Sequence, residues 1–590
     1  MQKARLGTRA GWLLPALLSL ALPAAVQAQF SFTITNGAVT ITGYTGPPWA
    51  VTIPSSISGY PVTTIGAEAF SYQTTVTGMM IPDTVTNIGF HAFYGCFSLT
   101  SILVDTNNPA YGSVSGVLFN KSQTMLIAFP AMLSGSYSIP NNVTDIVDSA
   151  FSFCSSLTNV TIGTNVTSIG YAAFHDCSRL ASVTIPLSIA NIGDHAFYYC
   201  TCLTSITIPN SVISIGDVEF LQCSSLTNVT IGTNVTSIGD NAFAGCTSLA
   251  SVTIPGSVTS IGTGAFAGCS LTNVTIPDSV TNLAGAAFGN GTRLTSILVD
   301  TNNPAYSNVA GVVFNKNQTV IVAFPSGLSG SYVIPNSVIS IGGSAFQGCA
   351  LASVMIPNSV ASMGTNAFAW SSSLTNVIIP DKITNIGNLA FYICTSLTSV
   401  TIPSNVTSIG NASFGYCSHL TTVTIGSSVT SIGKDAFEGC TSLTNVTIPN
   451  SVTSIGDEAF YSCSSLTNAY FLGNAPSGTN TIFAGESGTV YYLPGTTGWG
   501  STFGGWPTAL WYLPNPMILG SGYGLGATTK GFSFNISWAT NAPVVVEACT
   551  SLANPLWLPL ATNTLLSGTN YFSDSHWTNY SGRFYRLRSP

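Results

Sequence analysis

The chain has 590 residues, more than one ordinary hydrophobic core supports, so we expect several domains or one elongated array. Only 6% of its residues are charged, so the polar surface must come from Ser, Thr, Asn and Gly. The formal net charge of −7 argues against nucleic acid and anionic lipid as partners, because both bind a basic face.

Residues 1–28 have the pattern of a secretory signal peptide. Three basic residues precede an apolar stretch at 12–22, and Val-Gln-Ala at 26–28 provides a small-residue cleavage site. A signal anchor is the alternative, although the apolar stretch is short for a membrane span. Cleavage would remove three of the 13 Lys and Arg residues and leave 10 against 20 Asp and Glu, a charge of −10. We therefore expect a secreted or cell-surface protein that does not insert into the membrane once the signal is cleaved.

After the leader, the alternating segment 29–60 predicts a β-rich N-terminal cap, and residues 61–470 form an array of repeats. An anchor Phe recurs every 22 or 23 residues, with two jumps of 58. The jumps contain sibling inserts, at about 102–139 and 297–334, which both begin ILVDTNNPAY. Because the inserts and the anchors that follow them share an offset of 195 residues, a block of several coils was duplicated as a unit.

One segment, CSSLTNVTIGTNVTSIG, occurs at 154–170 and returns without change at 223–239. Its L-x-x-V-x-I pattern turns Leu, Val and Ile inward and leaves Asn159 and Thr161 outward, which predicts a short strand. A coil of this size cannot bury its apolar side chains alone, so successive coils must stack into a solenoid. The verbatim repeat therefore marks structural equivalence rather than a duplicated active site.

The turn that closes each coil is expected to contain a short helical segment. Val166 and Ile169 return to the core, and Gly170 permits the next bend. In sister coils, Asp240 or Asp457 lies just before the anchor segment, where a carboxylate would cap a helical turn. Phe and Cys three residues apart would share one side of that turn.

The recurring phrases L-T-N-V-T-I and V-T-S-I-G-x-x-A-F-x-x-C resemble the BspA-type leucine-rich repeat family of bacterial surface proteins. The resemblance covers about residues 60–470, and the V-D-T-N-N-P inserts are similar to variant units of that family. Asn165 lies near the usual asparagine position of leucine-rich repeats, although most coils carry Ser there. The resemblance implies a secreted or surface-displayed solenoid used for binding, often for adhesion to host or matrix proteins, without catalytic residues.

The sequence changes character after the array. Residues 471–513 are interpreted as a C-terminal cap or linker, and alternating runs in 514–590 predict a small β-sandwich. The predicted fold is thus a β-rich solenoid, a right-handed leucine-rich-repeat superhelix of about 23-residue coils, each with a short strand and a turn or short helical segment, followed by a small all-β domain. Three C-terminal arginines could form a basic edge, but charged residues on an edge strand explain them more simply. These arginines are Arg583, Arg586 and Arg588.

No residue pattern indicates catalysis, a metal site or a cofactor. Twelve of the 14 cysteines lie three residues after an anchor Phe, which favours a column of buried thiols, with disulfides between neighbouring coils as the alternative. The histidines occupy variable positions and are interpreted as exposed filler. Asp105, Asn107 and Asn108 resemble half of a calcium loop, but an Asx turn explains them better.

Any specificity is expected on the outward positions of the strands. Solubility and β-propensity alone account for the polar columns, whereas apolar residues interrupt them at three places and could be anchors. The candidate ligand-binding residues are Met80, Asn159, Thr161, Ser182, Thr184, Ser205, Thr207, Asn228, Thr230, Met355 and Ile378.

The leading hypothesis is a non-enzymatic binding or adhesion protein that recognises an extended protein partner through the solenoid face. The partner would be a host, matrix or neighbouring-cell protein, with a glycan as the other candidate. A second hypothesis is a carbohydrate-binding or enzyme-accessory protein that uses the C-terminal module, since six of the nine tryptophans lie in the last 92 residues. A third, adsorption to ice through the threonine columns, conflicts with the methionines that interrupt them.

Overall fold

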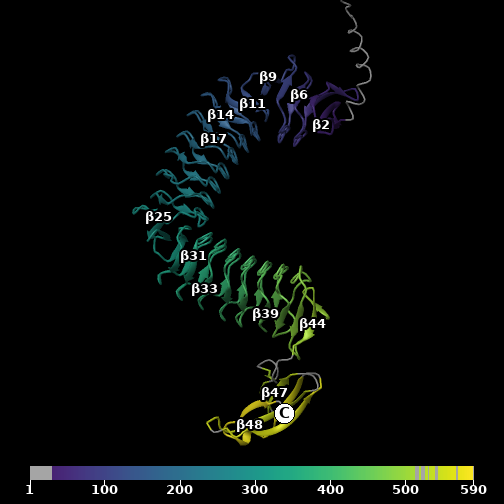
Figure 1. Ribbon diagram of the computed structural model, residues 1–590, viewed down its shortest axis with the longest axis vertical. Helices are drawn as coiled ribbons and strands as arrows, with labels where there is room; N and C mark the ends of the chain where they lie inside the picture. The colour runs from purple at the N-terminus through teal and green to yellow at the C-terminus, as the bar shows by residue number, and fades with distance from the viewer. Residues whose placement is uncertain are drawn as a thin grey trace, which may run out of the picture. The chain divides into compact units, whose positions relative to one another are not determined.

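The computed structural model describes residues 29–511, 517–519, 525–528, 531–538, 542–553, 555–566 and 569–588, and the predicted signal peptide at 1–28 lies outside them. Contacts divide the chain into two compact units, Met1–Asn317 with Ala323–Gly327, and Gln318–Val322 with Leu328–Pro590. Within each unit the chain winds as a stack of short coils (Figure 1). The elements of the two units are therefore given separately.

A regular coil contains two short strands joined by turns. The first strand of one coil, β14 (Leu157–Thr161), pairs parallel with β16 (Ser182–Thr184) of the next coil. Its second strand, β15 (Ser168–Ile169), pairs in the same way with β17 (Asn191–Ile192). We call the first strands of successive coils ladder A and the second strands ladder B. The sequence predicted only the first strand, so ladder B extends that prediction.

In the first unit, ladder A consists of β3 (Ala50–Thr52), β6 (Gly78–Ile81), β8 (Ser101–Val104), β12 (Gly135–Ser138), β14, β16, β18 (Ser205–Thr207), β20 (Asn228–Thr230), β23 (Asn273–Ile276) and β25 (Ser296–Val299). Ladder B consists of β7 (Asn87–Ile88), β13 (Asp145–Ile146), β15, β17, β19 (Ser214–Ile215), β21 (Ser237–Ile238), β22 (Ser260–Ile261) and β24 (Asn282–Leu283).

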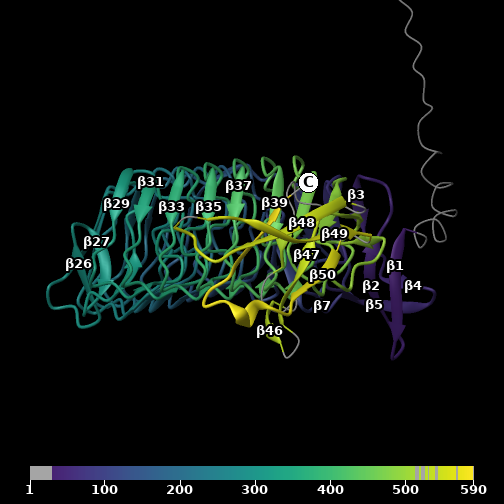
Figure 2. The same ribbon diagram turned by 90° about the horizontal axis from the view of Figure 1, so that it is seen from below.

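In the second unit, ladder A consists of β29 (Gly330–Val333), β31 (Leu351–Met355), β33 (Asn376–Ile378), β35 (Ser399–Thr401), β37 (Thr422–Thr424), β39 (Asn445–Ile448), β41 (Asn468–Phe471), β42 (Thr489–Tyr492) and β44 (Trp506–Leu510), the last paired with β43 (Thr502–Phe503). Ladder B consists of β30 (Ser340–Ile341), β32 (Ser362–Met363), β34 (Asn385–Ile386), β36 (Ser408–Ile409), β38 (Ser431–Ile432) and β40 (Ser454–Ile455). Strands β29 to β39 of ladder A stand side by side in Figure 2.

The predicted inward residues form the core. Leu157, Val160 and Ile162 are at most 3% exposed, and Val166 and Ile169 are fully buried. From Phe151 to Phe288, the ring centroids of successive anchors lie 4.7 to 5.7 Å apart with nearly parallel planes. This spacing matches the distance between neighbouring strands, so each coil buries the same side chains of its neighbour.

The predicted helical turn is wrong, because among the described residues the one helical segment is the 3-10 turn η1 (Trp577–Asn579). The turns instead include residues with left-handed φ, such as Asn241 at 53°. Their N–H groups donate to the following coil, as from Phe243 N to Ala265 O at 2.7 Å. Asp240 does not cap a helix, since its Oδ1 accepts the N–H of Thr263 in the next coil at 2.6 Å.

The role predicted for Gly170 also needs correction. Its φ is not left-handed, so the bend does not require glycine. A Cβ at this position would lie 2.5 Å from the backbone N of Asp148 in the preceding coil. Glycine is needed here because two coils approach each other closely.

Each insert adds a β-hairpin, which interrupts the ladders. In the first unit, β9 (Tyr111–Val114) and β10 (Val117–Asn120) form one hairpin, and β26 (Tyr306–Val309) and β27 (Val312–Asn315) form the other. After the first hairpin, β11 (Met125–Ala128) resumes ladder B by pairing with β13. Strand β28 (Val320–Ala323) pairs with β30 in the second unit.

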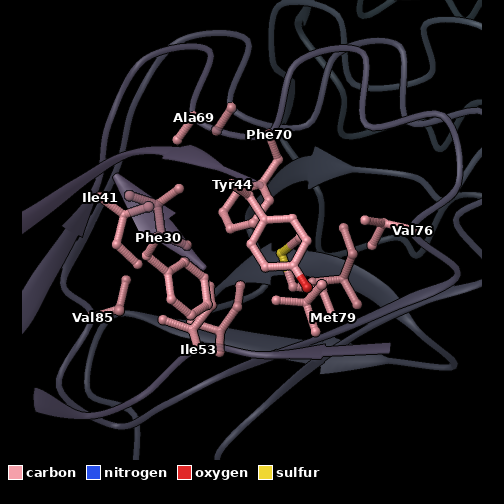
Figure 3. Close-up of a cluster of buried hydrophobic side chains, with 14 of the residues drawn as sticks. Phe30, Ile41, Tyr44, Ile53, Ala69, Phe70, Val76, Met79 and Val85 are labelled. Carbon is pink, nitrogen blue, oxygen red and sulfur yellow. The ribbon is translucent and has the colours of Figure 1, made fainter. Parts of the chain in front are cut away.

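Short strands close the N-terminal end of the stack. β1 (Phe30–Thr35) and β2 (Ala38–Tyr44) form an antiparallel hairpin, and β2 pairs parallel with β5 (Tyr60–Ile65), which also pairs with β4 (Ser56–Ile57). Phe30, Tyr44 and Phe70 pack together over the end of the core (Figure 3).

The C-terminal strands form two antiparallel sheets around a core that includes Phe534, Ile536, Val544 and Val546. The carboxylate of Glu547 pairs with Arg586 at 2.8 Å and with Arg588 at 3.0 Å, and both arginines lie on the edge strand β51, as the simpler explanation expected. One sheet contains β45 (Met517–Ile518), β46 (Gly526–Thr528), β47 (Gly531–Ser537) and β50 (Thr569–Asp574), and the other contains β48 (Ala542–Cys549), β49 (Leu558–Leu565) and β51 (Phe584–Arg588).

Candidate functional site on ladder A

All of the sequence-predicted ligand-binding residues lie on strands of ladder A. Met80 and the eight Asn, Ser and Thr residues belong to the first unit, and Met355 and Ile378 belong to the second. Their side chains are exposed, except that Asn159 is half-buried. The structure therefore places them in two separate rows, one in each unit, rather than in one pocket.

The polar row of the first unit follows from the in-register pairing of its strands. Asn159 lies opposite Ser182, and Thr161 lies opposite Thr184. The next two strands repeat the arrangement at positions 205, 207, 228 and 230. The Ser182 hydroxyl donates to Asn159 Oδ1 at 2.7 Å, so part of the hydrogen-bonding capacity is used within the ladder. The threonine hydroxyls at this register stand outward on the strand face.

An apolar row begins ladder A of the second unit. Val333, Met355 and Ile378 lie opposite one another on three paired strands. They are 62%, 57% and 61% exposed, respectively. Later coils carry threonine at the same register, as at Thr401 and Thr424, so the fold does not require apolar residues here. Contiguous exposed apolar side chains of this kind mark interaction surfaces.

The same register becomes aromatic at the other end of this ladder. Thr447 lies opposite Tyr470, and Tyr470 lies opposite Tyr491. The two tyrosine rings stack with centroids 5.3 Å apart, and Trp511 packs against Tyr470 at 4.7 Å. Ladder A of the second unit thus has an apolar end, a threonine middle and an aromatic end.

Sequence reasoning missed two apolar neighbours of the predicted anchors. Leu103 lies opposite Met80 and is exposed, and Val333 lies opposite Met355. Both residues fall inside the inserts, although Leu103 follows Met80 at the regular spacing of 23 residues and Val333 precedes Met355 by 22. The local alternation of the segments around 103 and 333 was the signal that could have found them.

The cysteine column is a ladder of buried thiols. All 14 cysteines are unpaired, and 13 of them are buried. In the regular coils, each thiol donates to the carbonyl of the anchor Phe in the preceding coil, as from Cys177 Sγ to Phe151 O at 3.0 Å. Burial raises the pKa of Cys177 well above its ordinary value, which keeps the thiol protonated and unreactive. In one coil Ser371 replaces Cys and makes the same bond to Phe346 O at 2.9 Å.

Three histidines, His91, His175 and His195, are half-buried rather than exposed filler, contrary to the sequence interpretation. His91 is half-buried, and its Nε2 lies 2.7 Å from Ser149 Oγ. His175 Nδ1 lies 3.0 Å from the Tyr94 hydroxyl, and burial lowers its pKa to about 4. No group of three His, Cys, Asp or Glu side chains within the described ranges could hold a metal ion.

The proposed half calcium loop is an Asx turn. Asp105 Oδ1 accepts the Asn107 N–H at 2.8 Å. Asn108 is fully buried, and its amide donates to Pro82 O and Val85 O while its Oδ1 accepts two N–H groups. These side chains are therefore committed to the fold of the insert.

The C-terminal tryptophans are largely covered by other side chains. Trp506 is buried and stacks on Phe483, and Trp499 stacks on Tyr492. The Arg586 guanidinium lies 4.5 Å above the Trp557 ring. Rings covered in this way leave little free aromatic face for a sugar.

Two ladders of short parallel strands, with one stacked phenylalanine and one buried leucine per regular coil, define a leucine-rich-repeat solenoid. The family model described as the BspA type leucine rich repeat region matches residues 50–134, 127–234, 213–330, 323–440 and 407–495, about three quarters of the chain. The chain belongs to this family.

Solved structures of bacterial leucine-rich repeat proteins are similar to this chain. A leucine-rich cell surface protein from Faecalibacterium prausnitzii A2-165 is 29% identical over 76% of this chain and 94% of its own, with a TM-score of 0.39. A leucine-rich repeat protein from Eubacterium ventriosum is 25% identical over 61% of this chain and 95% of its own, with a TM-score of 0.42. No curated protein matches the chain. Within the described residues, no helix has the length and apolar character to cross a bilayer.

Proposed function

We propose that the protein is a secreted or cell-surface binding protein that recognises an extended protein partner through ladder A of its second unit. The observation that carries this proposal is the row of exposed apolar side chains at Val333, Met355 and Ile378. Membership of a family of bacterial surface proteins supports the location.

The chemistry of the row favours a neutral, extended partner. The row and the threonines that continue it carry no charge, so charged ligands gain nothing from them. Apolar residues at one end and tyrosines at the other end would anchor two side chains of the partner, with threonine hydroxyls between them. At about 4.8 Å per coil, Ile378 and Tyr470 lie about 19 Å apart, which an extended peptide of about six residues spans.

The proposal is tested by replacing apolar residues of the row with threonine, the residue that later coils carry at the same register. The double variant Met355→Thr, Ile378→Thr should weaken binding to the isolated partner at least tenfold, because it removes two exposed apolar anchors. Thermal unfolding should be unchanged, since both side chains are exposed. Ile339→Thr is the matched control, because Ile339 is also exposed but lies next to ladder B.

Binding would be measured by biolayer interferometry against the protein captured from the native extracellular fluid by the full mature chain. Equal affinity of the double variant and of the Ile339→Thr control would overturn the proposal.

A further inference from the structure

A cavity of about 460 Å³ lies in the first unit, where the first insert interrupts the ladders. One wall is the turn that contains Phe90, His91, Phe93 and Tyr94. The other sides come from the insert and from the following coil, and they include Tyr111, Asn120, Met125, Ala128, Asp148 and Ser149. The volume lies within the range typical of small-molecule sites.

The coil that contains the insert has a short turn, which leaves space beside the preceding coil. In a regular coil, 13 positions separate Ile169 on ladder B from Ser182 on ladder A. In the insert coil, only 10 positions separate the equivalent residues, Leu126 and Ser136. Phe93 of the preceding coil is half-buried, whereas the other anchor rings from Phe70 to Phe460 are at most 2% exposed. The turn of the sister insert is equally short, with 10 positions between Ile321 and Ser331, so the turn alone does not open the cavity.

The turn beside the cavity can be compared with a turn of identical sequence in a regular coil. The tetrapeptide His-Ala-Phe-Tyr occurs at 91–94, beside the cavity, and at 195–198, beneath a regular coil. In the second copy, His195 N and Phe197 N donate to carbonyl groups of the next coil at 3.2 and 2.9 Å. In the first copy, the N–H groups of His91 and Phe93 have no acceptor among the described residues. They therefore point toward the space that a regular coil would fill.

The walls of the cavity are aromatic and carry no cation. The His91 ring stacks between Phe90, with centroids 3.6 Å apart, and Tyr94, at 4.6 Å. Burial lowers the pKa of His91, although Glu68 and Asp148 act in the opposite direction, so the ring is neutral at neutral pH. No Lys or Arg lines the cavity, and Asp148 does. An anionic ligand would therefore meet no compensating charge.

The sister insert keeps the scaffold but not this lining. At the offset of 195 residues, His91 and Tyr94 correspond to Ala286 and Gly289, and Ala131 corresponds to Ser326. The buried Ser326 hydroxyl donates to Phe288 O at 3.0 Å, and Phe288 is only 2% exposed. The insert architecture alone therefore does not explain the aromatic lining beside Phe93.

We propose that this cavity binds a small aromatic molecule that carries a hydrogen-bond acceptor and no negative charge, such as an aromatic amide. The ring of the ligand would pack against Phe93 and the neighbouring aromatic side chains, and its acceptor would receive the free backbone N–H groups. This site is independent of the protein-binding surface on ladder A.

The test uses the full mature chain and benzamide as the probe, followed by saturation-transfer NMR titration. The expected dissociation constant is of the order of 1 mM, because benzamide has few atoms. The double variant His91→Ala, Tyr94→Ala should weaken binding at least tenfold. The matched variant His195→Ala, Tyr198→Ala, at the same coil positions, should bind as the wild type does.

A second variant, Ala128→Leu, should abolish binding by filling the cavity while the protein remains folded. Benzoate, which has a similar shape but a negative charge, should bind at least fivefold more weakly than benzamide. No binding of benzamide, equal binding of benzoate, or an equal loss in both double variants would overturn the proposal.

Discussion

Glu219 shows how one residue can depart from an otherwise uniform core. It lies just before its anchor Phe, where most coils carry Ala, and it is fully buried. Its Oε2 accepts the Gly216 N–H at 2.7 Å, but its Oε1 has no partner among the described residues. Burial raises the pKa of this carboxyl well above its ordinary value. The folded chain therefore holds this proton more tightly than the unfolded chain does.

We expect Glu219→Ala to stabilise the protein by about 2 kcal/mol at pH 7, because it removes an unsatisfied buried polar atom. The part of this cost that comes from ionising the buried carboxyl is absent below the ordinary pKa of a glutamate and grows as the pH rises above it, since the folded-state pKa is raised. The gain in the midpoint of urea unfolding should therefore be larger at pH 7 than at pH 4. A gain of equal size at both pH values would contradict this explanation.

At the scale of a coil, the hydrogen bonds of the turn decide its conformation. The Ala-Phe segment has the composition of a helical turn, which is why the sequence favoured a helix there. Its Phe N–H instead donates to the next coil, as from Phe243 to Ala265 O. The local sequence does not contain this information, because the acceptor lies about 22 residues away. Gly170 is a second example: the sequence indicated a bend, but glycine is needed there because the preceding coil, about 22 residues away, approaches closely.

We expect Gly193→Ala to lower the thermal unfolding midpoint by several degrees, because its Cβ would lie 2.6 Å from the backbone N of Tyr171 in the preceding coil. Gly256→Ala is the matched control, since a Cβ there meets no atom within 4 Å. Differential scanning calorimetry of both variants tests the account. Equal midpoints for the two variants would show that the coils do not need this close approach.

At the scale of the whole molecule, the sequence predicted the periodic part well because every regular coil meets the same neighbours. The strand phrase, the Phe and Cys columns and the outward residues could all be assigned from spacing alone. The inserts could not, because their turns are shorter than those of a regular coil. Leu103 keeps the 23-residue spacing from Met80 and could have been assigned, whereas the cavity beside Phe93 became visible only in the structure.

Some coils carry exposed apolar residues at positions where the regular repeat has threonine. The strands of ladder A form with threonine at Thr401 and Thr424, yet the same register carries the exposed apolar residues Met355 and Ile378. The proposed binding function would account for these exposed apolar side chains.

The most direct test places a photo-crosslinking benzoylphenylalanine at Ile378 or, as the matched position on the same ladder, at Thr424. The mature chain with each substitution would be irradiated in native extracellular fluid and examined by mass spectrometry. The account predicts one dominant protein adduct at Ile378, suppressed by excess unmodified chain, and little at Thr424. Equal labelling at the two positions, or labelling at Ile378 that excess chain does not suppress, would contradict it.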